Sequence, residues 1–187
     1  KTPVQQHAKL RSIELADVAD LRTIEHEIAG FDACLFCLGV SSQGMKEEEY
    51  RRITYDITLA VAKTLVRLYP QMTFIYVSGS GTDSSERGRS MWARVKGRTE
   101  NDLLKLSFKA AYMFRPGLIL PLNGVSSKTK MYQFLYDVLR PFYPLLRKSN
   151  SVVTSEQLGK AMLQVVKKGY PSPIIESTEI KKINMIN

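Results

Sequence analysis

Short apolar segments alternate with helix-length segments along most of this chain, and this alternation constrains the fold more than any other feature. The apolar segments at 33–38, 73–78 and 111–114 are typical of buried strands, and 73–78 is rich in aromatic and β-branched residues. Segments of helix length follow the first two of them, at 46–69 and 91–106. Strands that alternate with helices form a parallel sheet with right-handed crossovers. The sequence therefore predicts an α/β fold built on a doubly wound parallel sheet.

The segment 46–69 is the clearest helix in the sequence. Its apolar residues recur close to the 3.6-residue helical period, at Tyr50, Ile53, Ile57, Val61, Leu65 and Leu68. Glu47 with Arg51, and Glu48 with Arg52, have the i,i+4 spacing and the orientation that favour ion pairs on a helix. We therefore expect a long amphipathic helix with one buried face and these two surface pairs.

The remaining elements are shorter. A strand is expected at 11–16, followed by a helical stretch to about residue 28, which Gly30 closes in the left-handed conformation that glycine adopts without strain. A last helix is expected at 155–167 and a small edge strand at 174–176. With no repeat or linker in view, we expect residues 1–187 to form a single domain.

An apolar, aromatic segment at 131–146 is interrupted by two prolines. Basic residues flank it: Lys128, Lys130, Arg147 and Lys148. This pattern suits a cover over a substrate pocket, a contact in a homodimer, or a helix on a membrane surface. We favour the first two interpretations over membrane contact.

Parallel α/β sheets bind ligands beyond the carboxyl ends of their strands. Three predicted loops meet at that edge, at residues 39–44, 78–83 and 116–120. We therefore expect a small-molecule site there. Polar residues 84–87 follow the second loop, and they either close over a substrate or form a mobile loop without function, which is the interpretation that we favour.

Composition narrows the function classes. A chain of 187 residues with 44% hydrophobic and 24% charged residues is ordinary for a globular domain. Its apolar runs are far shorter than the ~20 residues that cross a bilayer. Residues 1–6 contain no apolar signal core, so we expect a cytoplasmic protein.

The net charge of +9 favours an anionic partner. A nucleic-acid reader would show a known motif or aromatic residues within a basic stripe, and neither is evident. We disfavour nucleic acid for this reason. A phosphate-bearing small ligand and a merely solvated basic surface both remain open.

Cys34 and Cys37 have the Cys-x-x-Cys spacing of redox and metal sites. They lie in a predicted strand, however, where residues three apart point to opposite faces. His7 and His26 are isolated from them in the sequence. We therefore expect structural burial of the cysteines and no metal site.

Four stretches in order carry a family resemblance: Phe-Asp-Ala-Cys-Leu-Phe-Cys-Leu-Gly at 31–39, Phe-Ile-Tyr-Val-Ser-Gly at 74–79, Ala-Arg-Val-Lys-Gly-Arg-Thr-Glu at 93–100 and Phe-Arg-Pro-Gly at 114–117. Together they resemble the atypical short-chain dehydrogenase/reductase family, in particular the epimerase-like branch that includes the Tat-interacting-protein-like proteins. The resemblance implies a Rossmann-like fold, and NAD or NADP as cofactor.

The resemblance also implies roles for single residues. Those expected to contact the cofactor are Asp17, Val18, Leu38, Gly39, Lys96, Pro116, Gly117, Leu118 and Ile119. Lys96 would hydrogen-bond the hydroxyls of the nicotinamide ribose, and Gly39 would pass under the cofactor where a side chain would collide. The alternatives are a solvated helix lysine at 96 and a simple turn at 39.

Two features of the family are missing here. The glycine-rich turn that binds the pyrophosphate is absent from the sequence. The resemblance therefore implies that this domain is incomplete at its N-terminus, and that a first βαβ half of roughly forty residues precedes Lys1.

The second missing feature is the catalytic tyrosine, because Trp92 stands four residues before Lys96 in its place. Indole is only a donor and cannot act as an acid near neutral pH. The usual serine falls on Gly79, which leaves Ser78 or Ser80 as carbonyl donors and Lys96 as proton relay. The sequence thus predicts an epimerase- or reductase-like protein of doubtful activity with an unknown substrate, or a non-catalytic module that senses NAD(P)H. A structural α/β domain is a third, less favoured interpretation. Tyr76 is expected in the core.

Overall fold

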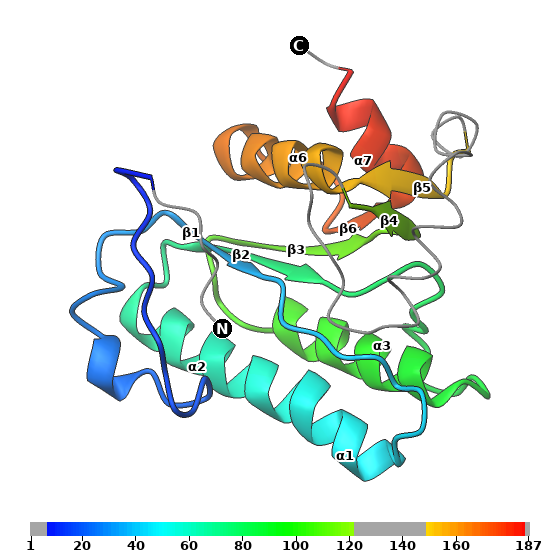
Figure 1. Cartoon of the computed structure of the whole chain (residues 1–187), viewed down its shortest axis with the longest axis horizontal. Coiled ribbons are helices and arrows are strands. Elements are labelled where there is room, and N and C mark those ends of the chain that lie inside the picture. The colour runs from blue at the N-terminus through cyan, green and yellow to red at the C-terminus, as the bar shows by residue number, and fades with distance from the viewer. Residues whose placement is uncertain (1–6, 122–148, 186–187) are drawn as a thin grey trace.

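The computed structural model describes residues 7–121 and 149–185. Its centre is a sheet of four parallel strands (Figure 1). In spatial order these are β1 (Ala33–Phe36), β2 (Thr73–Val77), β3 (Ala110–Arg115) and β6 (Ile174–Glu176). All four were predicted from the sequence, with small shifts at their ends. The parallel sheet confirms the predicted fold class.

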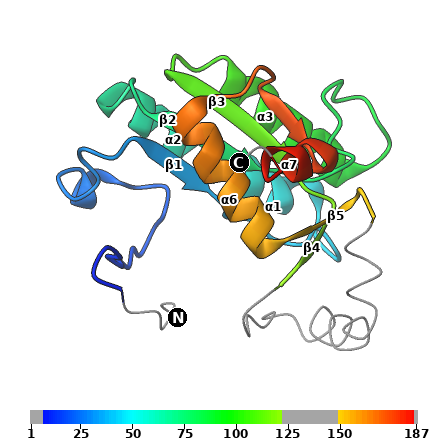
Figure 2. The ribbon, with the colours of Figure 1, turned by 90° about the horizontal axis from the view of Figure 1, so that it is seen from above.

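Helices cover both faces of the sheet (Figures 1 and 2). Below it in Figure 1 lie α1 (Glu47–Arg51) and α2 (Ile57–Leu68), which belong to one long helix, and α3 (Met91–Leu104). Above it lie α6 (Ser155–Lys168) and α7 (Ser177–Ile183). This arrangement on both faces is the doubly wound architecture that the sequence predicted.

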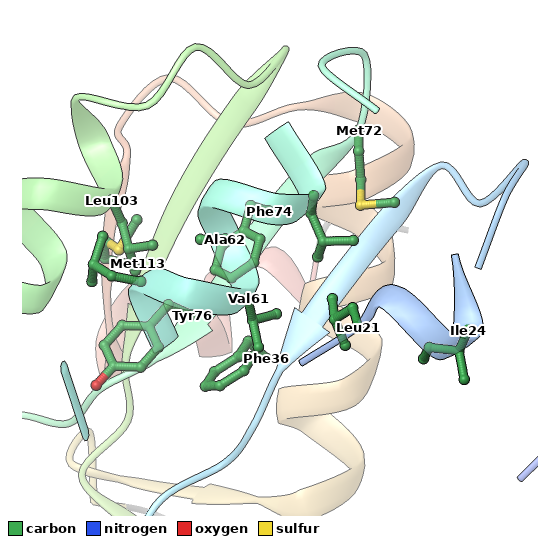
Figure 3. Packing of buried hydrophobic residues seen from close by; sticks show 12 residues of the cluster. Leu21, Ile24, Phe36, Val61, Ala62, Met72, Phe74, Tyr76, Leu103 and Met113 are labelled. Carbon is green, nitrogen blue, oxygen red and sulfur yellow. The ribbon is translucent and has the colours of Figure 1, made fainter. Parts of the chain in front are cut away.

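The strand β2 contributes to two cores, because its side chains alternate between the faces. Phe74 and Tyr76 join Phe36 and Val61 on the α2 side (Figure 3). Ile75 joins a second core, which includes Phe114, Val153, Leu158, Ala161, Ile175 and Ile180, on the α6 side. Tyr76 is a core residue, as predicted.

The predicted helix at 46–69 is present but contains an irregular turn. It consists of α1 (Glu47–Arg51), a π-helical turn (Arg52–Asp56) and α2 (Ile57–Leu68). Tyr50 and Leu65 of the predicted stripe are buried. The amphipathic pattern therefore predicted the helix and its buried face, but not the π turn inside it.

The π turn changes the ion pairs on this helix. Arg51 pairs with Asp56 at 3.5 Å, five residues on, which is the spacing of a π turn. Glu47 pairs instead with Arg94 of α3 at 2.7 Å. The predicted pair between Glu47 and Arg51 was wrong for this reason, and the described residues show no ion pair between Glu48 and Arg52 either.

A second, two-stranded parallel sheet was not predicted. Its strands are β4 (Leu118–Leu120) and β5 (Val152–Thr154), with Leu118 opposite Val152. β5 leads directly into α6, where Thr154 forms a capping box with Gln157. Each strand is too short to show a pattern of its own, so the sequence contained little signal for this sheet.

The predictions for the N-terminal segment were wrong. Residues 11–16 form no strand, and the expected helix is reduced to a 3-10 turn at Arg22–Ile24. A strand needs a neighbour for its backbone hydrogen bonds, and none of the described strands pairs with this segment. Leu21 and Ile24 nevertheless pack into the first core (Figure 3), and Gly30 has the predicted positive φ of 79°.

Cys34 and Cys37 are both free. Cys34 is half-buried in β1, where burial and the neighbouring Cys37 raise the pKa of its thiol to about 12. Cys37 follows the strand and is exposed, so its predicted burial was wrong. β1 ends at Phe36, so Cys37 lies outside the strand.

The apolar segment 131–146 lies outside the described residues. No helix in the described ranges is long and apolar enough to cross a membrane.

Candidate functional site

The carboxyl ends of β2 and β3 are joined directly by backbone hydrogen bonds. The Ser78 N–H donates to the Phe114 carbonyl at 2.9 Å, and the Ser80 N–H donates to the Pro116 carbonyl at 2.8 Å. Gly39 follows β1 at the same edge of the sheet, because β1 is parallel to β2. The structure thus brings the three predicted loops to one edge.

Lys96 reaches this edge from helix α3. Its Nζ donates to the backbone carbonyl of Ser78, at the end of β2. Burial lowers the pKa of Lys96 to about 8, against the attraction of Glu100, which raises it. Lys96 is therefore not the solvated helix lysine that the sequence left open.

The hydroxyl of Ser78 faces the interior. Ser78 is 7% exposed, and its hydroxyl donates to Glu100 Oε1 at 2.5 Å, with the Phe114 carbonyl 3.1 Å away. A hydroxyl has one proton to donate, and these two acceptors already compete for it. Of the two candidate serines, Ser80 is the exposed one.

Sequence reasoning missed the buried ion pair beneath the site. Glu100 is 0% exposed, and its carboxylate accepts from Arg115 Nε at 3.0 and 3.1 Å. Arg115 also donates to Ser84 Oγ at 2.6 Å and lies 3.3 Å from Glu176. A buried charge is costly unless it is paired, so these contacts are what allow Glu100 to be there. The available signal was its i,i+4 spacing from Lys96 on a helix.

The loop after β2 is tied to the protein. Asp83 accepts from Gly88 N at 2.7 Å, and Arg94 donates to the Gly88 carbonyl at 2.8 Å. A Cβ at Gly97 would lie 1.8 Å from the Asp83 carbonyl oxygen, so only glycine allows α3 to approach this loop. Residues 84–87, for which we favoured a mobile loop, are exposed, and hydrogen bonds such as that from Asn101 to Glu86 connect them to α3.

Trp92 lies at the start of α3, where it packs against the same loop. Its ring approaches to 3.4 Å of the position that a Cβ on Gly81 would take, and Gly81 has a positive φ of 86°. The indole therefore covers a glycine turn next to Ser80. It offers an N–H donor and no acid.

The residues expected to contact the cofactor near the ends of the first segments, Asp17, Val18, Leu38 and Gly39, are exposed. Asp17 and Val18 are exposed, and the Asp17 carboxylate accepts from the Ala19 N–H at 2.9 Å. Leu38 is 39% exposed. No atom lies within 4 Å of the position that a Cβ on Gly39 would occupy, so this backbone is open to a ligand. No hydrogen bond joins Asp17 to the edge where Lys96 lies, among the bonds of the described residues.

The residues after Pro116 are engaged in the protein itself. Gly117 N donates to Ser177 Oγ at 2.6 Å, and a Cβ at Gly117 would lie 2.1 Å from the Ser151 carbonyl oxygen. Leu118 N donates to Ser151 O at 3.0 Å, and Ile119 lies in β4. The backbone N–H groups of Gly117 and Leu118 are thus already bonded, while Pro116 stays next to Ser80.

Comparison with known proteins gives one relative by sequence. No family model matches the chain. Protein FMP52-2, mitochondrial, from Scheffersomyces stipitis is 30% identical over 123 residues, which are 64% of this chain and 52% of that protein. The chain therefore spans about half the length of this relative.

Solved structures match more of the chain. RMD from Pseudomonas aeruginosa, complexed with NADPH, has a TM-score of 0.66 at 12% identity, over 89% of this chain and 65% of its own. The Bordetella bronchiseptica enzyme WbmG, in complex with NAD and UDP, has a TM-score of 0.58 at 11% identity, over 88% of this chain and 56% of its own. UDP-N-acetylglucosamine 4-epimerase from Bacillus cereus has a TM-score of 0.56 at 13% identity, over 86% of this chain and 63% of its own.

These matches define the class of fold. The chain has a Rossmann-like α/β fold, which it shares with these three structures. It spans less than two thirds of each of these three structures.

Proposed function

We propose that this chain binds a nicotinamide dinucleotide, NAD or NADP, as part of an epimerase- or reductase-like protein. The observation that carries the proposal is Lys96, a half-buried ammonium docked on the Ser78 carbonyl at the carboxyl edge of the sheet. Two similar structures hold NADPH and NAD, which supports the same class of ligand here.

The residues at this edge fit the cofactor in part. Lys96 would donate to ribose hydroxyls, and the open backbone at Gly39 leaves space for the ribose and phosphates. Pro116 would border the nicotinamide beside Ser80. The glycine-rich turn that usually binds the pyrophosphate is absent from residues 1–187, so these residues supply only part of the expected cofactor site.

The chemistry would be limited by the missing acid. A bound nicotinamide gives or takes a hydride, and the protein must then move a proton at the substrate oxygen. Ser80 is exposed and would donate a hydrogen bond to a carbonyl, while Lys96, with a pKa of about 8, would relay the proton. Proton transfer by a positioned acid contributes roughly 10²–10⁴-fold to a rate, and Trp92 cannot supply it.

Trp92 also favours a second function. With Trp92 at the tyrosine position and the Ser78 hydroxyl directed at Glu100, the site would bind NAD(P)H without turnover and act as a sensor or regulatory module. Trp92→Tyr separates the two functions. If only the acid is missing, this variant gains turnover of simple aldehydes and ketones with NADPH or NADH. Turnover that stays at zero favours the sensor.

Calorimetry of the full-length protein with NADPH and NADH tests binding itself. Lys96→Met should weaken binding of whichever dinucleotide binds more tightly by roughly 10- to 100-fold, because it removes a hydrogen bond from a charged group. Lys63→Met is the matched control, because Lys63 is exposed on α2, away from the strand ends. Absence of binding to either dinucleotide by the wild-type protein would overturn the proposal.

We also propose a cytoplasmic location and a homodimer contact through residues 131–146. FMP52-2 is described as mitochondrial, so cell fractionation should test mitochondria first. Sedimentation of the protein with and without apolar residues of 131–146 replaced tests the dimer.

A further inference from the structure

We infer that Glu100 and Arg115 are positioning residues for Lys96: together they hold the Ser78 turn on which its ammonium docks and balance the charge around it. This inference rests on the proposed function, because it assigns the buried pair to the same site. It stands on two links: Ser78 hydrogen-bonds both Lys96 and Glu100, and Glu100 is paired with Arg115.

Ser78 connects the ammonium to the pair. Its carbonyl accepts from Lys96 Nζ, and its hydroxyl donates to Glu100 Oε1. Glu100 lies one helical turn after Lys96 on α3, so both side chains reach Ser78 from the same helix. A change at the carboxylate therefore acts on the residue that Lys96 binds.

Arg115 connects the carboxylate to the rest of the edge. It leaves the end of β3 immediately before Pro116 and contacts Glu100, Glu176 of β6 and Ser84 of the loop. One guanidinium thus joins two strands, α3 and the loop after β2. The forked donors of arginine suit such simultaneous contacts, which a lysine cannot make.

The charges around Lys96 come from several elements. The carboxylates of Glu100 and Glu176 both contact Arg115, and Glu100 also attracts Lys96. The phenol of Tyr76, on β2, is also close to Glu100, and burial raises its pKa. The phenol thus stays uncharged, and the carboxylates and cations balance each other.

This arrangement predicts opposite effects for the two partners. Glu100 attracts the Lys96 proton, so Glu100→Gln should make that proton leave more easily. Arg115 neutralises Glu100, so Arg115→Gln should strengthen the attraction and hold the proton more tightly. Loosening of the site would instead admit water in both variants and raise the pKa of Lys96 in both.

The test is an NMR titration of Lys96 in protein labelled at the lysine side chains, without cofactor. We expect a change of about tenfold in the acid dissociation constant of Lys96, upward in Glu100→Gln and downward in Arg115→Gln. Glu156→Gln, which removes a surface carboxylate paired with Lys160 on α6, should leave Lys96 unchanged. The inference is overturned if the pKa of Lys96 moves in the same direction in Glu100→Gln and Arg115→Gln, or if it moves in neither variant.

If Arg115→Gln does not fold, Arg115→Lys supplies the second arm. This variant keeps the positive charge but loses the forked guanidinium. The titration midpoint of Lys96 should therefore stay near that of the wild type, while the affinity for the dinucleotide falls. A Lys96 midpoint that shifts as it does in Glu100→Gln contradicts the inference. The affinity of the wild type for NADPH should also fall as pH rises through the Lys96 midpoint, and Glu100→Gln should move that fall to lower pH. Because the titration uses no cofactor, absence of dinucleotide binding overturns only the proposed function.

Discussion

The two neighbouring strands β1 and β2 lie in the same sheet but in different surroundings. Phe74, Ile75 and Tyr76 of β2 are almost fully buried, and β2 pairs with a strand on each side. Among the described strands β1 pairs with β2 alone. Leu35 within β1 is 39% exposed, and Phe31 just before it is 61% exposed. Burial of an apolar strand thus depends on its neighbours as much as on its own residues.

The same contrast divides the candidate site. At the ends of β2 and β3, backbone hydrogen bonds and a buried ion pair hold Ser78, Lys96 and Pro116 in place. At the end of β1, Gly39 and its neighbours are exposed and make no such contacts in the described structure. We therefore expect mutations at the β2–β3 end to cost stability, and mutations at the β1 end to act mainly on ligand binding.

Glu100→Ala should have the largest effect. It leaves Arg115 buried without its carboxylate, and breaking a buried pair in this way costs roughly 3–5 kcal/mol of the free energy of unfolding. Urea denaturation at pH 7 measures this loss. A loss no larger than that of a surface substitution would contradict the view that the β2–β3 end is held by this pair.

Gly97→Ala should destabilise by about 3 kcal/mol, because its methyl group collides with the Asp83 backbone and α3 must move away. Gly39→Ala is its counterpart at the β1 end. With no atom nearby, it should change stability by less than ~0.5 kcal/mol yet weaken dinucleotide binding. Urea denaturation and calorimetry of both variants check the comparison, and equal losses of stability would remove it.

Lys96→Met should stabilise the protein by roughly 1–3 kcal/mol at pH 7, since burial of the ammonium lowers its pKa from 10.5 to about 8. Between these two pH values the unfolded chain binds the proton and the folded protein does not, so wild-type stability rises with pH relative to the variant. The advantage of Lys96→Met is thus complete below pH 8 and shrinks toward pH 10.5. Unfolding curves at several pH values test this, and Lys63→Met should show no such trend.

Leu35→Thr should have the smallest effect, below ~0.5 kcal/mol, because the side chain is already partly exposed at the sheet edge. Ile75→Thr, one strand away on the same face, should cost several times more, since Ile75 is fully buried. Similar values for the two variants would mean that β1 is covered in solution.

The sequence correctly predicted the strands and helices that depend on local residue patterns. Buried runs marked β2 and β3, and helical periodicity marked the long helix even across its π turn. Residues 11–16 look like a strand locally but have no partner among the described strands. The β4–β5 pair joins Leu118 to Val152, and contacts between residues so distant in sequence leave no local signal.

The candidate site followed the same rule. Lys96 and Ser80 were predicted from the family resemblance, and the parallel sheet brought their loops together as expected. The inward direction of the Ser78 hydroxyl depends on Glu100 and Arg115, which are distant from it along the chain. Only the folded arrangement shows that connection.

The close approach of Gly97 to the Asp83 main chain also determines the direction in which Lys96 points from α3. A steric stop made of backbone fixes the rotation of α3 about its own axis, whatever side chains cover its outer surface. An exposed residue of that helix, such as Leu104, is therefore free to vary without turning the Lys96 ammonium away from the strand end.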